Sequence, residues 1–302
     1  MTTAGLVRGA FAGLATLDVI NLVERLPDAD QKVTAVAQFV AAGGPATNAA
    51  VTFTALGGQA LLLTSTGSGA IGRIIADELT SLGVEVVDVA PGMPHDAPVS
   101  SVTLVKGSSS RSVIGSDAAA VSVPAPDPSL IAGALEGCDV ALLDGHHPDL
   151  ARGFAHQVSG NRIPTVLDAG RWKPVMADVV DHVSDVVASA DFRLPGTSDS
   201  HRMARQLASG ARNVVVTAGE HPVRWWDGQS QGEVEVPEVS AVDTLGAGDV
   251  FHGAYAFALA HGAPLVERIE FASRVAATRC QVLGPRTWLG RIRELGAAFS
   301  QR

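Results

Sequence analysis

Short apolar runs rich in β-branched residues alternate along most of the chain with longer segments whose apolar residues recur every three or four positions. This alternation predicts strands joined by helices, and hence a mostly parallel sheet covered by helices on its faces. The strands are expected at residues 9–14, 60–64, 84–89, 140–143, 164–167, 185–188 and 213–217. The helices are expected at residues 45–56, 71–82, 129–135, 149–158, 198–208, 247–261 and 264–280. The fold class is therefore an α/β sandwich.

Two regions break this alternation because they resemble strand pairs with no helix after them. The first comprises residues 19–23 and 32–40, and the second comprises residues 98–105 and 111–115, with a hairpin turn at Gly107-Ser108-Ser109-Ser110. They are expected to form a small sheet that acts as a lid over a cleft. Residues 1–302 are predicted to form a single domain, with lid strands from about 16–41 and 97–116.

Charge and composition narrow the class of ligand. The chain has 22 Lys and Arg against 31 Asp and Glu, which gives a net charge of −9. Nucleic-acid binding depends on clustered Lys and Arg, and the sequence has no such cluster, so a small-molecule ligand is expected. The two cysteines, Cys138 and Cys280, are too few for a disulfide framework and lack zinc-site spacing. A reducing cytoplasm is the expected compartment.

The sequence also predicts that the chain neither spans nor enters a membrane. It has no run of about 18 uninterrupted apolar residues. The N-terminal segment is interpreted as a first strand rather than a signal peptide, because Asp18 interrupts its apolar run and no small-residue cleavage site follows.

A glycine-rich turn, Asp243-Thr244-Leu245-Gly246-Ala247-Gly248-Asp249, leads into a long apolar helix near the C-terminal end. A helix N-terminus offers unpaired N–H groups, and small residues let an anion approach the backbone closely. The amides of Ala247, Gly248 and Asp249 could therefore hold a phosphoryl group, while the Asp249 carboxylate orients a hydroxyl and takes its proton. The alternative is a plain helix start, in which an aspartate caps the helix and the glycines shape the turn.

A second glycine cluster, Ala42-Gly43-Gly44-Pro45-Ala46-Thr47-Asn48, again lies where a strand meets a helix. Its backbone amides and the Asn48 side chain could meet a polyol at the edge where open α/β folds bind ligands. Asp18 is a second candidate for binding a hydroxyl, and its alternative is a simple turn residue.

A third turn points to another class of enzyme. The stretch Gly67-Ser68-Gly69-Ala70-Ile71-Gly72 fits GxGxxG, follows a strand, opens a helix and precedes a strand that ends near Asp88. This is much of a dinucleotide-binding fingerprint, so an NAD-dependent oxidoreductase is an alternative. The pattern is weakly specific in a chain with 32 glycines, and the unit does not contain the first strand of the fold. A flexible turn beside the cleft is the plain interpretation.

The first two glycine clusters, AAGGPATNAAVTFTALGG and VDTLGAGDVFHGAYAFAL, resemble the two motifs of the ribokinase-like family of carbohydrate kinases, the PfkB family. The resemblance covers nearly the whole chain, including the lid strands and the segments VVVTAGE and FASRVAATRC. It implies a three-layer ribokinase-like sandwich with a small β-sheet lid. It also implies an ATP-dependent sugar kinase that uses Mg²⁺ and transfers the γ-phosphoryl group to a hydroxyl of a small carbohydrate.

The resemblance implies roles for individual residues. Asp249 matches the catalytic base, and the anion hole for the γ-phosphoryl group matches Gly246, Ala247 and Gly248. The sugar contacts match Asp18, Gly44 and Asn48, and the nucleotide contacts match Thr217, Gly219 and Ser273. A loop that holds K⁺ in many members matches the backbone oxygens of Asp243, Leu245, Cys280 and Leu283. The carboxylate of Asp249 is expected to be a weak base, because a helix N-terminus stabilises its anion, and a late proton transfer tolerates this.

Two departures from the family pattern affect the nucleotide side. The family often carries an Asn-x-x-Glu stretch that organises Mg²⁺ and phosphate, whereas this chain reads Val187-Ala188-Ser189-Ala190-Asp191-Phe192, in which Asp191 could substitute. The nucleotide turn ends in His221-Pro222, where relatives usually have glycine. A non-catalytic sugar or nucleotide sensor is therefore a further alternative.

The substrate is less constrained than the reaction. The segments FHGA and FASRVAATRC resemble the sulfofructose kinase branch, while DTLGAGD also resembles ketohexokinase, and both branches phosphorylate a ketohexose. Lys32 and Arg111 on the lid, with His146 and His147, are candidates to meet an anionic group, against a simple solvated role. Exposed lid edges, together with the resemblance, imply a homodimer formed through the lid.

Overall fold

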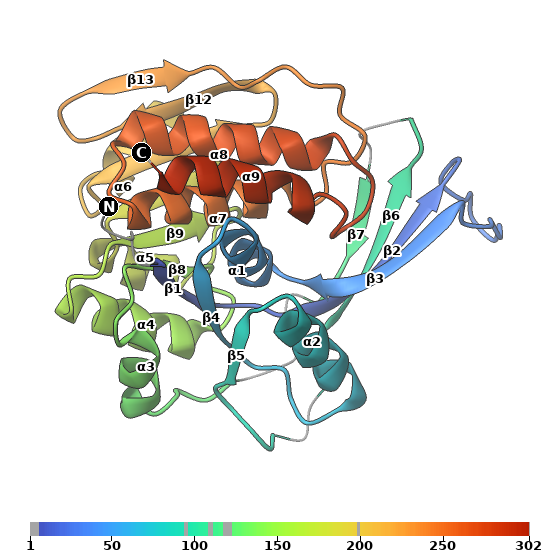
Figure 1. The fold of residues 1–302 in the computed structure, drawn as a ribbon, viewed down its shortest axis with the longest axis horizontal. Coiled ribbons are helices and arrows are strands. Elements are labelled where there is room, and N and C mark those ends of the chain that lie inside the picture. The colour runs from blue at the N-terminus through green and yellow to red at the C-terminus, as the bar shows by residue number, and fades with distance from the viewer. Residues whose placement is uncertain (1–5, 94–95, 108–110, 117–122, 198–199, 302) are drawn as a thin grey trace.

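The computed structural model describes residues 6–93, 96–107, 111–116, 123–197 and 200–301 (Figure 1). Its central sheet has the strand order β13-β12-β11-β10-β9-β8-β1-β4-β5. Neighbours from β11 to β5 pair in parallel, whereas β12 and β13 pair antiparallel at one edge. The strands are β1 (Arg8–Ala12), β4 (Gln59–Thr64), β5 (Glu85–Asp88), β8 (Val140–Leu143), β9 (Thr165–Ala169), β10 (Asp185–Ser189), β11 (Asn213–Ala218), β12 (His221–Trp226) and β13 (Gln231–Val234).

Helices cover both faces of this sheet, and each face has its own apolar core. In β8, Val140 and Leu142 pack into one core while Ala141 and Leu143 pack into the other, as the alternation of side chains along a strand requires. One face carries α1 (Pro45–Ala55), α2 (Ala70–Ser81), α7 (Ala247–Ala260), α8 (Leu265–Cys280) and α9 (Leu289–Ser300). The other carries α3 (Pro128–Leu135), α4 (Pro148–Gly160), α5 (Met176–Val179), a 3₁₀ turn (Val180–His182) and α6 (Ser200–Leu207). The predicted three-layer sandwich is confirmed.

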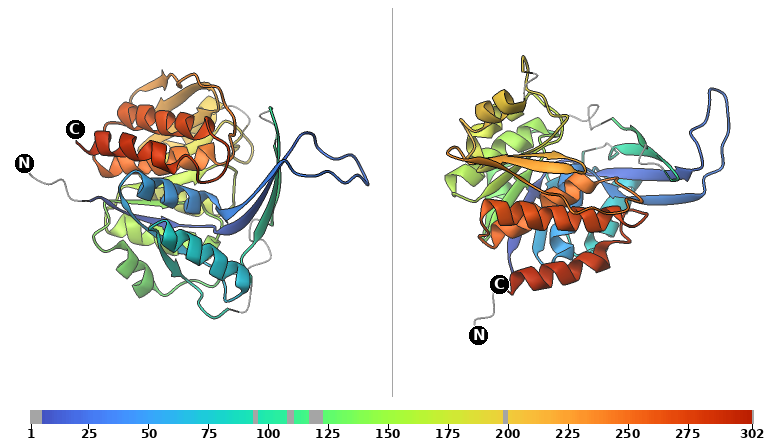
Figure 2. Two further views of the ribbon diagram at one scale, coloured as in Figure 1. Left: turned by 45° about the vertical axis from the view of Figure 1, so that its right-hand side comes forward. Right: turned by 90° about the horizontal axis from the view of Figure 1, so that it is seen from above.

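A second sheet projects from the main body as the predicted lid (Figure 2). Its order is β3-β2-β6-β7, from β2 (Thr16–Val23), β3 (Ala37–Gly43), β6 (Val99–Val105) and β7 (Arg111–Ile114). The buried side chains of Ile20, Leu22, Val102 and Leu104 cluster with Phe39, Leu245 and Leu283. The inner face of the lid therefore packs on two loops of the main body. One loop contains Leu245 and precedes α7, and the other contains Leu283 and follows α8.

The structure differs from the sequence-based expectation at several elements. The strand expected at 32–40 lies at Ala37–Gly43, and the helix α9 and the β12–β13 hairpin were not predicted in full. The turn expected at Gly107-Ser108-Ser109-Ser110 and the start of the helix expected at 198–208 fall partly outside the described residues. Within the described ranges, no helix is both long enough and apolar enough to cross a membrane.

Candidate active site

Asp249 lies in the first turn of α7, directly after a turn in which Gly246 has a positive φ of 72°. Its Oδ2 accepts a hydrogen bond of 2.8 Å from Nδ2 of Asn48, in the first turn of α1. The two helices approach so closely that a Cβ at Gly253 would lie 2.4 Å from the carbonyl oxygen of Ala49. The structure thus joins the two glycine clusters of the sequence into one site.

Arg286 fixes the other end of the Asn48 amide. Its Nη1 donates to Oδ1 of Asn48 at 3.2 Å, and its Nε donates to Oε1 of Glu78 at 2.9 Å. Nη2 donates to the carbonyl oxygen of Ala42, and Oε2 of Glu78 accepts the amide of Ala42 at 2.6 Å. Arg286 therefore orients Asn48 toward Asp249, a role for which the sequence offered no signal because Arg286 stands in an irregular loop.

The acidity of Asp249 differs from the expectation of a weak base. Burial, and after it the nearby carboxylate of Asp168, raise the pKa of Asp249 to about 6. The hydrogen bond from Asn48 and the neighbouring His252 act in the opposite direction. The desolvation of the carboxyl group therefore outweighs the helix N-terminus, and the group is poised to exchange a proton near neutral pH.

Asp168 and His252 form a buried pair behind Asp249. Asp168 is the penultimate residue of β9 and is 4% exposed, and its Oδ2 lies 3.2 Å from Nδ1 of His252. Nε2 of the same ring lies 3.1 Å from the carbonyl oxygen of Val187 in β10. Sequence reasoning missed Asp168, although a carboxylate near the carboxyl end of a buried parallel strand lies close to the edge where such folds bind ligands.

The lid contributes Asp18 to the same cleft. Oδ1 of Asp18 accepts the hydroxyl of Thr16 at 2.7 Å, and burial raises the pKa of Asp18 although hydrogen bonds from Thr16 and Ser100 oppose the shift. A Cβ at Gly43 would lie 2.1 Å from Oδ2 of Asp18. Gly44 has a φ of 104°, and a Cβ there would lie 2.2 Å from the carbonyl oxygen of Leu14. Both glycines are therefore needed for this approach of β2 to the start of α1.

A small cavity unites these groups. Its lining includes Asp18, Asn48, Gly246, Arg279, Arg286 and Trp288. Of the predicted sugar-binding residues, Asp18 and Asn48 line it, and the hydrogen bond from Asn48 connects this lining to Asp249. A carboxylate, an amide and a base around one cavity can bind and deprotonate a hydroxyl-bearing molecule.

The expected nucleotide contacts are less uniform. Thr217 stands half-buried near the end of β11, and Gly219 forms the turn to β12 with a φ of 64°. Asp191 is exposed just after β10. Ser273 departs from the expectation, because it is only 3% exposed and its hydroxyl has no hydrogen-bond partner within the described part of the chain. A residue enclosed in this way by α8 and its neighbours does not present its hydroxyl to a ligand at the surface.

The expected K⁺ loop is also different. Arg279 donates from Nη1 to the carbonyl oxygen of Asp243 at 3.2 Å. The carbonyl oxygen of Cys280 accepts the amides of Val242 and Asp243 at 2.7 and 3.2 Å, and that of Leu283 accepts the hydroxyl of Thr287 at 2.6 Å. Three of the four oxygens expected to bind K⁺, all but that of Leu245, thus already accept hydrogen bonds from the protein. The positive charge of Arg279 at the oxygen of Asp243 also opposes a second cation there, so the site does not fit the ion.

The carboxylate of Asp88 holds the GxGxxG turn through hydrogen bonds. Oδ2 of Asp88 accepts the amide of Gly67 at 3.2 Å and the hydroxyl of Thr66 at 3.0 Å. A Cβ at Gly72 would lie 2.4 Å from the carbonyl oxygen of Thr66, so this glycine allows α2 to pack on the turn. The carboxylate that an NAD site would direct to ribose instead holds the loop, which removes the basis for the oxidoreductase alternative.

Asp144 anchors the loop after β1 to the start of α1. Its side chain is fully buried and accepts the amides of Leu14, Ala46 and His146 at 3.0, 3.1 and 2.9 Å. Burial opposes ionisation, but the charge and hydrogen bonds of His146 hold the pKa of Asp144 well below its usual range. Nδ1 of His146 lies 3.1 Å from Oδ1 of Asp144, so this histidine is committed to a structural contact rather than to an anionic ligand.

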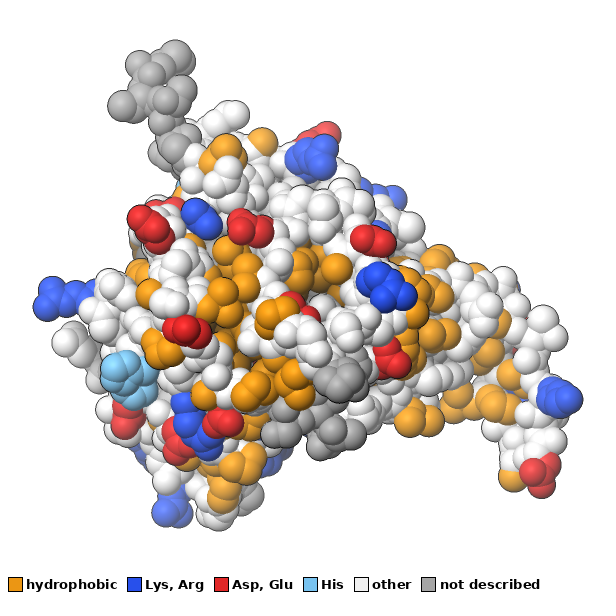
Figure 3. All heavy atoms as spheres, turned by 90° about the horizontal axis from the view of Figure 1, so that it is seen from below, with side chains coloured by type: hydrophobic (Ala, Val, Ile, Leu, Met, Phe, Trp, Pro, Cys, Tyr) orange, Lys and Arg blue, Asp and Glu red, His pale blue; other side chains and the backbone are white. Residues whose placement is uncertain are grey.

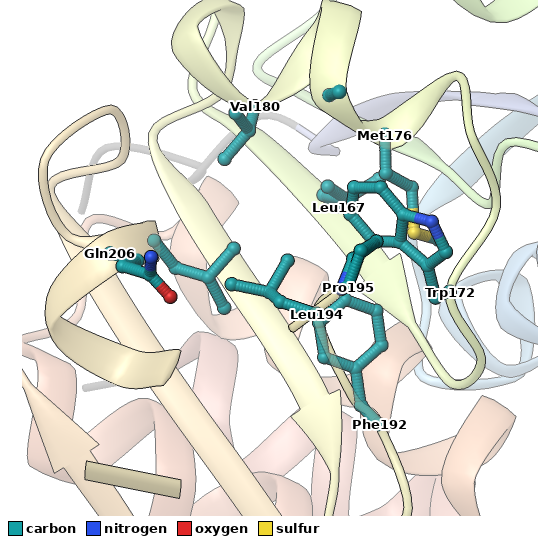
Figure 4. A pocket seen from close by; sticks show the side chains of 10 residues that line it. Leu167, Trp172, Met176, Val180, Phe192, Leu194, Pro195 and Gln206 are labelled. Atoms are coloured by element: carbon teal, nitrogen blue, oxygen red, sulfur yellow. The ribbon is translucent and has the colours of Figure 1, made fainter. Parts of the chain in front are cut away.

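A larger apolar cavity of about 230 Å³ lies on the other face of the sheet (Figure 4). Its lining includes Leu167, Trp172, Met176, Phe192, Leu194 and Gln206. It contains none of the predicted catalytic groups. The predicted sugar contacts Asp18 and Asn48 instead line the smaller cavity.

Comparisons with known proteins agree with this geometry. A family model described as pfkB family carbohydrate kinase matches residues 173–289. Ribokinase of Bacillus subtilis (strain 168) is 25% identical over 275 residues, which cover 88% of this chain and 90% of the relative. Ketohexokinase of Mus musculus is 25% identical over 293 residues, which cover 90% of this chain and 95% of the relative. A structure of Arabidopsis thaliana ribokinase complexed with ribose and ATP has a TM-score of 0.78 at 22% identity, over 99% of this chain and 100% of that chain.

Proposed function

We propose that this chain, whose residues 173–289 match the pfkB family of carbohydrate kinases, is an ATP-dependent kinase that phosphorylates a hydroxyl of a small sugar. The observation that carries this proposal is the position of Asp249. Its carboxylate lies at the N-terminus of α7, beside a glycine turn, and is held by an amide from α1. A carboxylate beside the backbone N–H groups of a helix start supports this proposal, because transfer of a phosphoryl group to a hydroxyl uses a base and anion-binding donors together.

Asp249 acts as the base toward the acceptor hydroxyl in this proposal. The amides around Gly246, Ala247 and Gly248 stabilise the charge that develops on the phosphoryl oxygens. Because phosphoryl transfer has a loose transition state, the proton leaves the hydroxyl late, and most of the catalysis comes from positioning and electrostatics. A carboxyl group whose pKa is about 6 is ionised at neutral pH and yet more basic than an ordinary aspartate.

The acceptor sugar would be bound by Asp18, Gly44 and Asn48. ATP would lie along the ends of β10 and β11, near Thr217 and Gly219. Mg²⁺ would neutralise the phosphates there, and the carboxylate of Asp191 fits this role because it is exposed just past the end of β10. The structure of the Arabidopsis relative holds ribose and ATP together, which supports two adjacent binding sites of this kind.

Ketohexoses, including sulfofructose, are the substrates that we propose to test first. Arg286 contributes little to binding an anionic sugar, because Asn48, Glu78 and Ala42 already accept its hydrogen bonds. Arg111 of the lid donates from Nη1 to the hydroxyl of Thr244 at 3.0 Å and remains exposed. Arg111 is therefore the better candidate to recognise a charged group on the sugar.

A panel of sugars, sugar acids, sulfosugars and nucleosides tests the function through ATP consumption and product mass. We expect turnover of at least one sugar. We also expect Asp249→Asn to lower kcat on the order of a hundredfold or more while sugar binding by calorimetry stays nearly unchanged. Unchanged kcat in this variant would exclude Asp249 as the base.

A sugar or nucleotide sensor is the second candidate, and it is favoured by the altered magnesium stretch around Asp191. Binding of a sugar and ATP without turnover of any member of the panel would support it. Binding of NAD without any ATP turnover would instead restore the oxidoreductase alternative.

We further propose that the protein acts in the cytoplasm, where its co-substrate ATP is abundant, and as a homodimer joined through the lid. The lid carries exposed apolar side chains, among them Val36, Val40, Val113 and Ile114. Figure 3 shows the lid extending from the main body with hydrophobic side chains on its surface. Pairing two lids would cover these side chains and the free strand edges.

A further inference from the structure

Two loops meet around a buried guanidinium group behind the start of α7. Arg279 stands in the last turn of α8 and is 2% exposed. Its Nη1 donates to the carbonyl oxygens of Asp243 and Val282 at 3.2 and 3.0 Å, and its Nη2 donates to Oδ2 of Asp243 at 2.9 Å. One side chain therefore binds loop 242–246 and loop 280–284 at the same time.

The partner carboxylate is saturated by the same two loops. Oδ1 of Asp243 accepts the amide of Leu245 at 2.9 Å, and Oδ2 accepts the amide of Gly284 at 3.1 Å in addition to Arg279. The ring of Trp288 lies 6.0 Å from Cζ of Arg279 and covers the pair. Because both charged side chains are at most 2% exposed, removal of either would leave an uncompensated charge in the interior.

This arrangement places a permanent positive charge where carbonyl oxygens converge. Converging carbonyl oxygens in a protein interior need either hydrogen-bond donors or a bound cation. Here the guanidinium group is the donor, and it stays charged at every physiological pH. A free monovalent cation would have to compete with the guanidinium group of Arg279 for the carbonyl oxygen of Asp243.

The position of these loops relates the charge to the proposed reaction. Loop 242–246 ends at Gly246, whose positive φ starts α7, and the amide of Ala247 donates to the carbonyl oxygen of Thr244 at 3.2 Å. Arg279 and Gly246 line the same small cavity. The conformation of the loop that presents the backbone N–H groups therefore depends on Arg279.

We infer that Arg279 is a positioning residue that permanently takes the place of the monovalent cation expected behind the anion hole, so that the enzyme does not depend on K⁺. The inference rests on the proposed kinase function for its effect on turnover. The part of the inference that concerns structure, namely that Arg279 holds loop 242–246, does not depend on which sugar is phosphorylated.

The first test uses the wild-type protein in KCl, NaCl or tetramethylammonium chloride at equal ionic strength. We expect kcat and KM to differ less than about twofold among the three salts, and Tm of the ligand-free protein to be equally indifferent. Activation of tenfold or more by K⁺ over tetramethylammonium, or a rise in Tm specific to K⁺, would overturn the inference. If no sugar is phosphorylated the proposed function fails, yet the comparison of Tm still tests Arg279.

The second test uses Arg279→Ala, with Arg274→Ala as the control because Arg274 is an exposed arginine of the same helix. We expect Arg279→Ala to lower kcat by about tenfold or more, low millimolar guanidinium ion to restore part of it, and Arg274→Ala to behave as wild type. Full activity of Arg279→Ala without any added cation would contradict the inference. Should that variant fail to fold, Arg279→Lys keeps the charge, and we expect it to fold with a lower Tm than wild type.

Discussion

At the scale of single residues, the basicity of Asp249 is set by what surrounds its carboxylate. Burial and the Asp168 carboxylate both favour the protonated form, whereas Asn48 and His252 favour the anion. The balance lies on the side of the protonated form, so the pKa of Asp249 is raised to about 6. A folded-state pKa above the unfolded one also means that the anion costs stability, and this cost builds up as pH rises from near 3.8 to about 6, above which it is complete.

The raised pKa predicts the acid limb of the pH profile. Only the ionised carboxylate accepts a proton, so kcat/KM should fall about tenfold per unit below a midpoint near pH 6. Asp168→Asn removes one negative neighbour and should move that midpoint to lower pH by roughly half a unit. The measurement is kcat/KM from pH 4.5 to about 8 in a constant-ionic-strength buffer. Asp181→Asn, an exposed aspartate of the 3₁₀ turn before β10, serves as the control and should leave the midpoint unchanged. An unshifted midpoint in Asp168→Asn would show that Asp168 does not act on Asp249.

Several residues of the site could be predicted from sequence, and others could not. Asp249, Asn48 and Gly44 stand in glycine-rich turns at helix starts, where local chemistry permits an anion site or a plain helix start, and the family resemblance favoured the first. In the sequence, Arg279 looks like an ordinary basic residue at a helix C-terminus. Its buried contacts depend on Asp243, which is distant in sequence, and on Val282 in the loop that follows α8. Asp168 in LDAG resembles a turn residue, because only the assembled sheet shows that it lies next to Asp249.

At the scale of elements, the close packing of α1 against α7 determines whether the Asn48 amide can donate its hydrogen bond to the Asp249 carboxylate. The two helices touch at Gly253 and Ala49, four residues after Asp249 and one after Asn48. A glycine at this point lets the backbones come close, so the Asn48 to Asp249 hydrogen bond of 2.8 Å depends on a residue that touches no ligand.

Gly253→Ala tests this dependence. Its new methyl group would meet the backbone of Ala49 at 2.4 Å, so the helices must separate. Overpacking of this kind costs about 1–3 kcal/mol, and we expect a lower Tm together with a fall in kcat of roughly tenfold. Gly290→Ala in α9 is the matched control, because a Cβ there meets no atom within 4 Å. Wild-type kcat and Tm in Gly253→Ala would contradict the role of this close packing.

The elements themselves were predicted unevenly. The buried parallel strands have continuous apolar runs and were placed within a few residues, and so were the helices between them. The helix α9 buries only Ile292, Gly296 and Phe299, so its apolar stripe is thin and its two glycines obscure it. The hairpin of β12 and β13 lies at the sheet edge and mixes polar with apolar residues, which gives a weak local pattern.

At the scale of the whole molecule, the outer face of the lid predicts the oligomeric state. Strand register aligns Val40, Val19, Ser101 and Ile114 in one row across the sheet. The two ends of the row, Val40 and Ile114, are 58% and 75% exposed. Burying this row against a second lid would remove apolar surface from water.

We expect the wild-type protein to have about twice the 31.0 kDa mass of the chain by light scattering after gel filtration. Val40→Asp combined with Ile114→Asp should shift it to the monomer mass, because two charges would then enter the interface. Val266→Asp, an exposed valine on α8 that is 39% accessible, should leave the mass unchanged. A monomeric wild type would contradict the proposed dimer, and a dimer in the double variant would place the interface elsewhere.

The division between the helix pair and the lid also bears on how such a molecule can change its substrate in evolution. Asn48 and Asp249 are tied to each other through backbones in direct contact, whereas Asp18 and Arg111 arrive on a sheet that rests on the body mainly through one small apolar cluster. Substitutions in the lid can therefore reshape the proposed acceptor pocket with little disturbance to the hydrogen-bonded pair of Asn48 and Asp249. A descendant of this protein would acquire a new sugar by altering residues 16–43 and 99–114, while the chemistry at the start of α7 is inherited unchanged.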